Sequence, residues 1–189
     1  MATTKRPMRA DAQRNRDAIL AAAREIFDAE GVLTSLDGIA LRAGVGNATL
    51  YRNFPTRDDL LAAVMRTSIE EALGEADSLA RTRSAREALA EWLATLTWQL
   101  RIWHDLPYCL AAAHNDAESP MKPAADPLLT RTGALLDAAQ TAGDADAGIT
   151  ADEVYELVLA LSWAVDRFGD DEPAARRRVA MGTAGIFAH

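Results

Sequence analysis

The chain contains 189 residues, 49% of them apolar and 25% charged, with a formal net charge of −8 at pH 7. Its single cysteine, Cys109, excludes an internal disulfide framework and a zinc-finger ligand set. No stretch approaches the ~20 consecutive apolar residues of a transmembrane helix, and no signal-peptide core follows Met1, so we expect a cytoplasmic protein without membrane contact.

Charge is distributed unevenly along the chain. Residues 1–57 contain nine Lys and Arg against six Asp and Glu, a balance of +3, whereas the remaining residues carry −11. A basic segment followed by an acidic one is typical of a phosphate-binding module joined to a domain with a different partner. Abundant alanine and few β-branched runs favour an all-α fold for both parts.

The N-terminal segment, residues 1–9, is basic and lacks helical periodicity. We expect either an arm that contacts phosphates or the minor groove of DNA, or an ordinary frayed terminus. Residues 35–61 then read as two short helices joined by a tight turn and followed at once by a third helix. Gly44 stands at the turn, where positive φ is favoured, and Val45 is its apolar plug. This arrangement is a device for placing a short helix in the major groove of DNA.

The segment resembles the helix-turn-helix of the TetR family of bacterial transcriptional regulators. The matching motifs are Ile39-Ala40, Ala43-Gly44-Val45, Thr49-Leu50-Tyr51 and Phe54-Pro55-Thr56-Arg57. With Phe27 and Gly31 upstream, the similarity covers about residues 14–66. The resemblance implies an all-α protein of about nine helices. Residues 1–57 would form the arm and a three-helix DNA-binding head, and residues 58–189 an effector-binding and dimerisation body.

Several side chains of the head suit contacts with DNA. Thr34 or Ser35 starts the second helix, and Thr34 with Asp37 resembles a capping box. Asn47 can pair with adenine, and Arg52 can bind guanine or a phosphate. The expected DNA-contact residues are Thr34, Ser35, Arg42, Gly46, Asn47, Ala48, Thr49, Tyr51, Arg52, Asn53 and Arg57. Tyr51 is assigned its phosphate contact by the resemblance. Asn53 replaces a histidine common in the family, which weakens or removes that contact.

The rest of the chain reads as helices divided by clear start and stop signals. The expected helices are about 57–79, 85–103, 107–115, 127–142, 151–168 and 174–187. Capping boxes at Ser84 and Thr150 open two of them, and Gly169 closes the fifth. Three prolines in residues 117–127 predict a loop that ends where Pro127 opens a helix.

The resemblance implies that the last two helices form a homodimer. The candidate interface residues are apolar or small: Val158, Leu161, Val165, Val179, Gly182 and Ile186. The alternative is that they fill the core of one chain. A homodimer would bind a palindromic operator.

Aromatic residues concentrate in the middle helices and favour a pocket for an apolar or amphipathic effector. The candidate lining residues are Trp98, Gln99, Trp103, His104, Tyr108, Cys109, Trp163 and Phe168. Such residues also serve as plain core, and a buried structural thiol is the favoured reading of Cys109. The resemblance implies that the effector releases a repressor from DNA, with no cofactor or metal.

Two other classes of function remain as alternatives. One is an effector-independent regulator or an architectural DNA-binding protein. The other is a metal-dependent enzyme using His104, His114 and nearby acids such as Asp105, Asp116 and Glu118. No HExxH motif, paired cysteines or glycine-rich phosphate loop supports the enzyme, so we expect a non-enzymatic protein.

Overall fold

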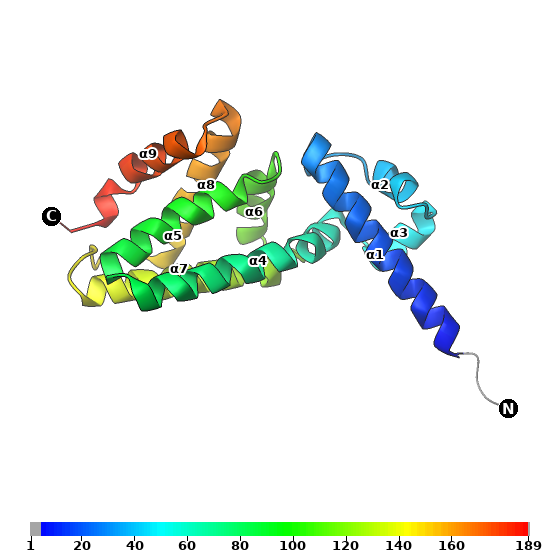
Figure 1. Cartoon of the computed structure of the whole chain (residues 1–189), viewed down its shortest axis with the longest axis horizontal. Coiled ribbons are helices and arrows are strands. Elements are labelled where there is room, and N and C mark those ends of the chain that lie inside the picture. Colours follow the sequence, from blue (N-terminus) through cyan, green and yellow to red (C-terminus); the bar gives the residue numbers. More distant parts are fainter. Residues whose placement is uncertain (1–4, 189) are drawn as a thin grey trace.

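The computed structural model describes residues 5–188 and has the predicted all-α architecture (Figure 1). The helices in this range are α1 (Lys5–Glu30), α2 (Leu36–Arg42), α3 (Asn47–Asn53), α4 (Arg57–Thr82), α5 (Ala85–Leu100), α6 (Leu106–His114), α7 (Lys122–Thr141), α8 (Ala151–Phe168) and α9 (Glu172–Gly182), with a 3-10 turn at Ala184–Ile186. Extended pairing among the described residues is limited to one isolated bridge, between Ala145 and Phe187.

The helices form a small head and a larger body, and α4 runs from one into the other (Figure 1). Helices α1, α2 and α3 pack together in the head, where Phe27, Ile39, Leu50 and Phe54 are buried. In the body, α4, α5 and α7 lie against one another, α8 packs on α5, α6 and α7, and α9 covers α5 and α8. The indole of Trp92 donates a buried hydrogen bond to Thr132 Oγ1 at 2.9 Å, which joins α5 to α7.

Three long helices, α4, α5 and α8, begin at capping boxes. In α4 the Asp59 amide donates to Thr56 Oγ1 at 3.1 Å, and the Thr56 amide donates to the Asp59 carboxylate at 2.9 Å. The same reciprocal pair forms at Ser84 in α5 and at Thr150 in α8. These bonds satisfy amides that a helix start leaves unpaired. The capping boxes predicted at Ser84 and Thr150, and Thr56 as a cap, are confirmed.

Of the two predicted starts of α2, Thr34 or Ser35, Ser35 is confirmed, and the predicted capping box from Thr34 to Asp37 is wrong. Ser35 is the N-cap, and its hydroxyl accepts from the Asp37 amide at 3.3 Å. The Thr34 hydroxyl instead donates a hydrogen bond to Glu30 Oε2 at 2.6 Å. Thr34 therefore bonds to the end of α1 and does not cap α2. The N-terminal segment also differs from expectation, because α1 already begins at Lys5. Residues 1–4 of the expected arm lie outside the described residues.

Two predicted helix boundaries, the start of α7 and the end of α9, are also wrong. Pro127 lies inside α7, which begins at Lys122 with Pro123 in its first turn, where a missing amide costs no helical bond. The helix continues because Ala125 and Leu128 are buried against the body. The last helix ends at Gly182 rather than residue 187. There the chain turns so that the Asp146 amide bonds to the Ile186 carbonyl at 2.9 Å.

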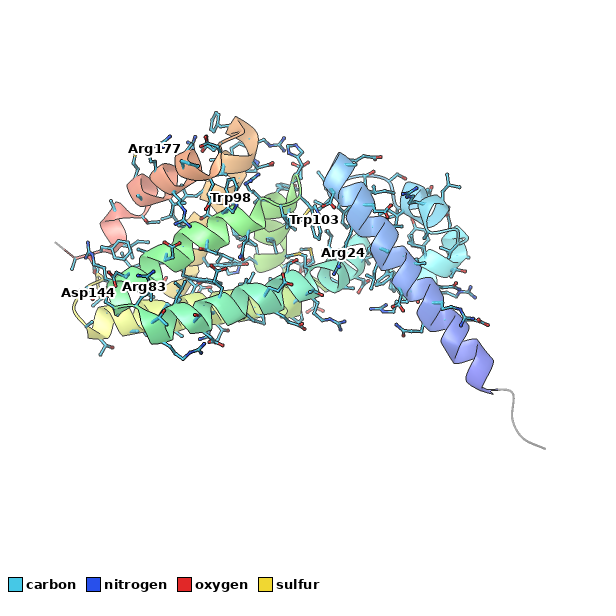
Figure 2. The ribbon with its side chains drawn as sticks, viewed as in Figure 1. Arg24, Arg83, Trp98, Trp103, Asp144 and Arg177 are labelled. Atoms are coloured by element: carbon cyan, nitrogen blue, oxygen red, sulfur yellow. The ribbon has the colours of Figure 1, made fainter. Side chains whose placement is uncertain are left out.

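Helix α5 ends at Leu100, not at the predicted Trp103, and the reason lies in the head. The Trp103 side chain turns toward α1, as Figure 2 shows, and its indole N–H donates to Asp28 Oδ1 at 2.6 Å. Its ring packs on Phe27 with centroids 5.6 Å apart. Trp103 is therefore a contact between head and body.

We predict that Gly31→Ala destabilises the protein more than Gly44→Ala. Both glycines have positive φ, +83° and +67°, which costs an alanine about 1 kcal/mol or more. A Cβ at Gly44 meets nothing within 4 Å, whereas one at Gly31 would lie 3.0 Å from His104 Cβ. Overpacking should raise the Gly31→Ala cost by a further ~1–3 kcal/mol. Urea unfolding of both variants measures this, and equal losses would disprove the close contact.

Candidate nucleic-acid interface and effector cleft

The turn between α2 and α3 holds α3 on the outside of the head. Gly44 has φ +67°, as its place in the sequence predicts, and the Val45 amide closes the turn on the Ala40 carbonyl at 3.0 Å. Buried Ile39 and Leu50 join the inner sides of the two helices. The opposite side of α3 therefore faces solvent.

Four of the predicted DNA-contact residues lie exposed on α3: Asn47, Ala48, Tyr51 and Arg52. Two of them have partners within the head. Asn47 Nδ2 donates to Asp37 Oδ1 at 2.8 Å, and Arg52 Nη2 donates to Thr49 Oγ1 at 3.0 Å. These bonds are exposed, so they hold the side chains loosely enough for DNA to replace them. Sequence reasoning assigned Asp37 to a cap and missed its position beside Asn47.

Of the other predicted DNA-contact residues, some are exposed on the head and some bond within it. Ser35 and Gly46 are exposed at the N-termini of α2 and α3, and Arg42 is exposed and forms an ion pair with Glu25. Asn53 is half-buried, and its Nδ2 donates to the Thr49 carbonyl at 2.8 Å.

Arg57 differs most from its predicted position at the DNA surface. One guanidinium nitrogen, Nη1, donates to the Val32 carbonyl at 2.5 Å and ties the start of α4 to the turn after α1. Arg16, which sequence reasoning missed, stacks on the Phe54 ring at 4.4 Å, and its Nη1 donates to the Asn53 carbonyl at 3.4 Å. Arg16 lies three residues before Ile19, so the two side chains fall on the same side of α1. This spacing was the sequence signal that Arg16 lies against the head.

The eight predicted pocket residues do not line one cavity. Gln99 and Trp103 line a small pocket of about 30 Å³ between α4, α5 and α7, close to the size of one water molecule. Tyr108 and Trp163 line a separate cleft of about 420 Å³ between α6 and α8. Arg101 covers the Trp98 ring at 3.4 Å, and Arg178 lies 5.0 Å from the Phe168 ring.

The larger cleft combines apolar walls with a polar end. Pro107, Ala111, Leu159 and Ala160 line it together with the exposed rings of Tyr108 and Trp163. The polar lining side chains are His114, Asn115 and Glu156. His114 Nε2 lies 3.6 Å from both Glu156 Oε1 and Asp152 Oδ1. We call this space the α6–α8 cleft.

The predicted dimer residues are mostly internal to one chain. Val158, Val165, Val179 and Ile186 are buried in the core, as the alternative reading of the sequence allowed. Leu161 is half-buried beside Gly182, whose added Cβ would lie 2.9 Å from Leu161 Cδ2. The outward side of the two helices carries Leu161 together with further apolar residues, some exposed and some half-buried: Leu157, Ala164, Phe168 and Met181. We call these the α8–α9 face.

Among the side chains that the structure describes, those of residues 11–188, no three His, Cys, Asp or Glu are grouped so that they could hold a metal ion. None of the described helices is long and apolar enough to span a bilayer.

Comparison with known proteins identifies the family of this chain. The model of bacterial regulatory proteins of the tetR family matches residues 19–64. The model of the C-terminal domain of SbtR-like transcriptional regulators matches residues 84–187, more than half of the chain. The chain belongs to the TetR family. It is a TetR-family transcriptional regulator, as its helix-turn-helix motifs predict.

Solved structures agree with this assignment over nearly the whole chain. A TetR regulator from Mycobacterium vanbaalenii is 30% identical and covers 96% of this chain and 100% of its own, with a TM-score of 0.50. The TetR regulator SCO0520 from Streptomyces coelicolor is 29% identical over 91% of this chain and 98% of its own, with a TM-score of 0.57. FadR from Bacillus subtilis, solved with stearoyl-CoA, shares the fold at 15% identity, with a TM-score of 0.65 over 90% of this chain and 98% of its own.

Curated relatives are matched over only about a third of this chain and of their own length. An HTH-type transcriptional regulator of Staphylococcus aureus is 41% identical over 64 residues, which are 33% of this chain and 35% of that protein. Members of the TetR family bind DNA and dimerise, and some bind small molecules.

Cys109 should be unreactive in the folded regulator. Burial, with a smaller contribution from the Asp58 carboxylate, raises the pKa of its thiol from 9.0 to about 11. Because the thiolate is the reactive form, iodoacetamide at pH 8 should modify the native protein about 100-fold more slowly than the unfolded one. The native rate should rise steeply between pH 8 and 11. Equal native and unfolded rates at pH 8 would contradict the shift.

Proposed function

We propose that this TetR-family regulator is a repressor that binds a palindromic operator as a homodimer and is released by a small molecule. The observation that carries the proposal is the exposed outer side of α3, with Asn47 in its first turn and Arg52 five residues on. The body is separate from this surface, as Figure 1 shows, so it is available for dimerisation and ligand binding. We place the division between head and body at residue 57, where Thr56 caps α4.

Base recognition falls to the first turn of α3 in this proposal. Asn47 exchanges its hydrogen bond to Asp37 for a bidentate pair with adenine, while Ala48 and Thr49 meet thymine methyl groups. Tyr51, Arg42, Ser35 and the backbone amides at Gly46 contact phosphates. Thr34 and Asn53 already bond within the head, so we assign them the weakest contacts.

Arg57 contributes mainly to the head fold in this proposal, although its sequence position suggests a phosphate contact. Its bond to the Val32 carbonyl fixes the turn after α1, and a half-buried guanidinium is costly to withdraw from such a bond. A phosphate contact would have to come from its remaining donors.

Dimerisation is proposed through the α8–α9 face, with partly different residues from those the sequence suggested. Met181 and Phe168 are 74% and 69% exposed in the single chain, an exposure that large apolar side chains lose at an interface. Pairing of the two helices with their copies would give a four-helix arrangement about a dyad. Two heads related by that dyad would meet half-sites about one DNA turn apart.

Effector binding is proposed in the α6–α8 cleft. Its volume of about 420 Å³ lies in the range of sites for drug-sized molecules. Its apolar walls, two exposed aromatic rings and few polar groups suit an apolar or amphipathic molecule. A ligand that prefers a head position unfit for DNA would shift the population away from the operator. This response separates the proposal from an effector-independent DNA-binding protein.

Asn47→Ala tests the recognition surface. Selection of bound DNA from a random pool first supplies the operator, which we expect to be palindromic. The variant should lose about 1–3 kcal/mol at that operator and accept other bases at one position per half-site. Nonspecific affinity should stay unchanged because an amide carries no charge. Binding to every single-base operator variant at one salt concentration measures this.

Gln13→Ala is the matched control, since Gln13 is an exposed neutral amide on α1 that bonds to Asp17. It should leave base preference intact. If Asn47→Ala also kept the full preference, α3 would not dock as proposed.

Met181→Asp tests the dimer surface. A carboxylate buried in an apolar interface is left unpaired, so the dimer dissociation constant should rise about 10-fold or more. The single chain should still fold, because Met181 is mostly exposed within it. Sedimentation equilibrium gives the constant. Leu41→Asp, which changes an exposed apolar residue of the head, should leave it unaltered, and an unaltered constant for Met181→Asp would rule out this face.

A further inference from the structure

The turn between α5 and α6, residues 101–105, contacts the head on one side. The Val32 amide, in the turn after α1, donates to the His104 carbonyl at 3.1 Å. Trp103 bonds to Asp28 and packs on Phe27 at the end of α1 (Figure 2). No space is left for a side chain at Gly31, because an added Cβ would lie 3.0 Å from His104 Cβ. The head therefore moves with this turn or loses several contacts.

The same turn is held on its other side by the end of α8. Arg167 donates to the Asp105 carboxylate, and its Nη1 donates to His104 Nε2 at 2.7 Å. His104 Nδ1 in turn lies 3.1 Å from Asp166 Oδ1, within hydrogen-bond distance. Because a guanidinium only donates hydrogen bonds, His104 Nε2 faces Arg167 as the acceptor and Nδ1 faces Asp166.

The backbone at Asp105 shows that this contact constrains the turn. Its φ is +67°, and among the described residues it is the only non-glycine with positive φ. Such a conformation is unfavourable for an L-residue and persists where the surroundings hold it. Here the Asp105 side chain, 16% exposed, is held by Arg167.

We propose that Arg167, His104 and Asp105 are positioning residues that connect the helix of the dimer face to the DNA-binding head. We call these three the α8 clamp. It fixes the α5–α6 turn against α8, and the turn fixes residues 31 and 32 of the head. Loss of the clamp frees the head locally without disrupting the core of the body.

The clamp also adjoins the α6–α8 cleft, which links it to the effector response proposed above. This step alone rests on that proposed function. The Arg167 guanidinium lies 5.8 Å from the Trp163 ring, and Tyr108 follows Asp105 by three residues. A molecule that separates α6 from α8 in the cleft lengthens the contact between Arg167 and Asp105. The head then loses its fixed position.

Amide hydrogen exchange of the free full-length protein tests the clamp without DNA or effector. Arg167→Gln keeps most of the side-chain volume and removes the charge. Because loss of a charge pair of about 1 kcal/mol changes a local opening equilibrium about fivefold, the Val32 amide should exchange about fivefold faster. The amide of Leu93, in the buried middle of α5, should keep its rate. This readout is independent of operator or effector binding.

A second variant and a matched control make the result decisive. Asp105→Asn removes the partner charge while asparagine tolerates the left-handed backbone, so it should fold and accelerate Val32 similarly. Arg176→Gln is the control: Arg176 pairs with Glu91 and Glu172 between α9 and α5, with exposure close to that of Arg167. It should leave Val32 unchanged. Unchanged Val32 exchange in both clamp variants, equal acceleration in Arg176→Gln, or equal acceleration of Leu93 would overturn the proposal.

Discussion

Docking of the Trp103 indole on the end of α1 is the contact on which the arrangement of this regulator depends. Trp103 can reach Asp28 and Phe27 because α5 stops one turn before it, at Leu100. A helix continued through Trp103 would change the direction of the ring and remove the turn that carries the His104 carbonyl. The head is thus held by α4 along the chain and by this turn across space. With one connection alone, the orientation of α3 would follow the bending of α4.

The DNA-binding surface is largely self-paired in the free protein. Asn47 bonds to Asp37, Arg42 pairs with Glu25, and Arg52 bonds to Thr49. Each of these contacts is exposed, and exposed pairs contribute about 0–1 kcal/mol, so DNA can exchange them at small cost. The bonds reduce the number of side-chain conformations before binding, which lowers the entropy lost on the operator.

The body places its two proposed interaction sites on the same helix. One side of α8 lines the α6–α8 cleft through Leu159 and Trp163, and its outward side contributes Leu161 and Ala164 to the α8–α9 face. Its last turn carries Arg167, which holds the α5–α6 turn. A rigid helix of this kind connects distant contacts because its side chains move together. In the proposed mechanism, a small displacement of α6 from α8 is therefore sufficient to alter the head.

Local chemistry in the sequence was sufficient to predict the helix-turn-helix, the family and most helix starts. Some features depend only on residues a few positions apart, and the sequence alone predicts them. They are the capping box from Thr150 to Glu153, the cap at Thr56 and the turn at Gly44. Tertiary contacts decided the rest. Thr34 bonds backward to Glu30, Pro127 stays helical because its neighbours are buried, and Arg57 turns to a carbonyl 25 residues away. Val158 and Val165 look the same in sequence whether they fill a core or meet a partner. Only the packing of α8 on α5, α6 and α7 placed them inside, because burial depends on segments that the chain brings together from far apart.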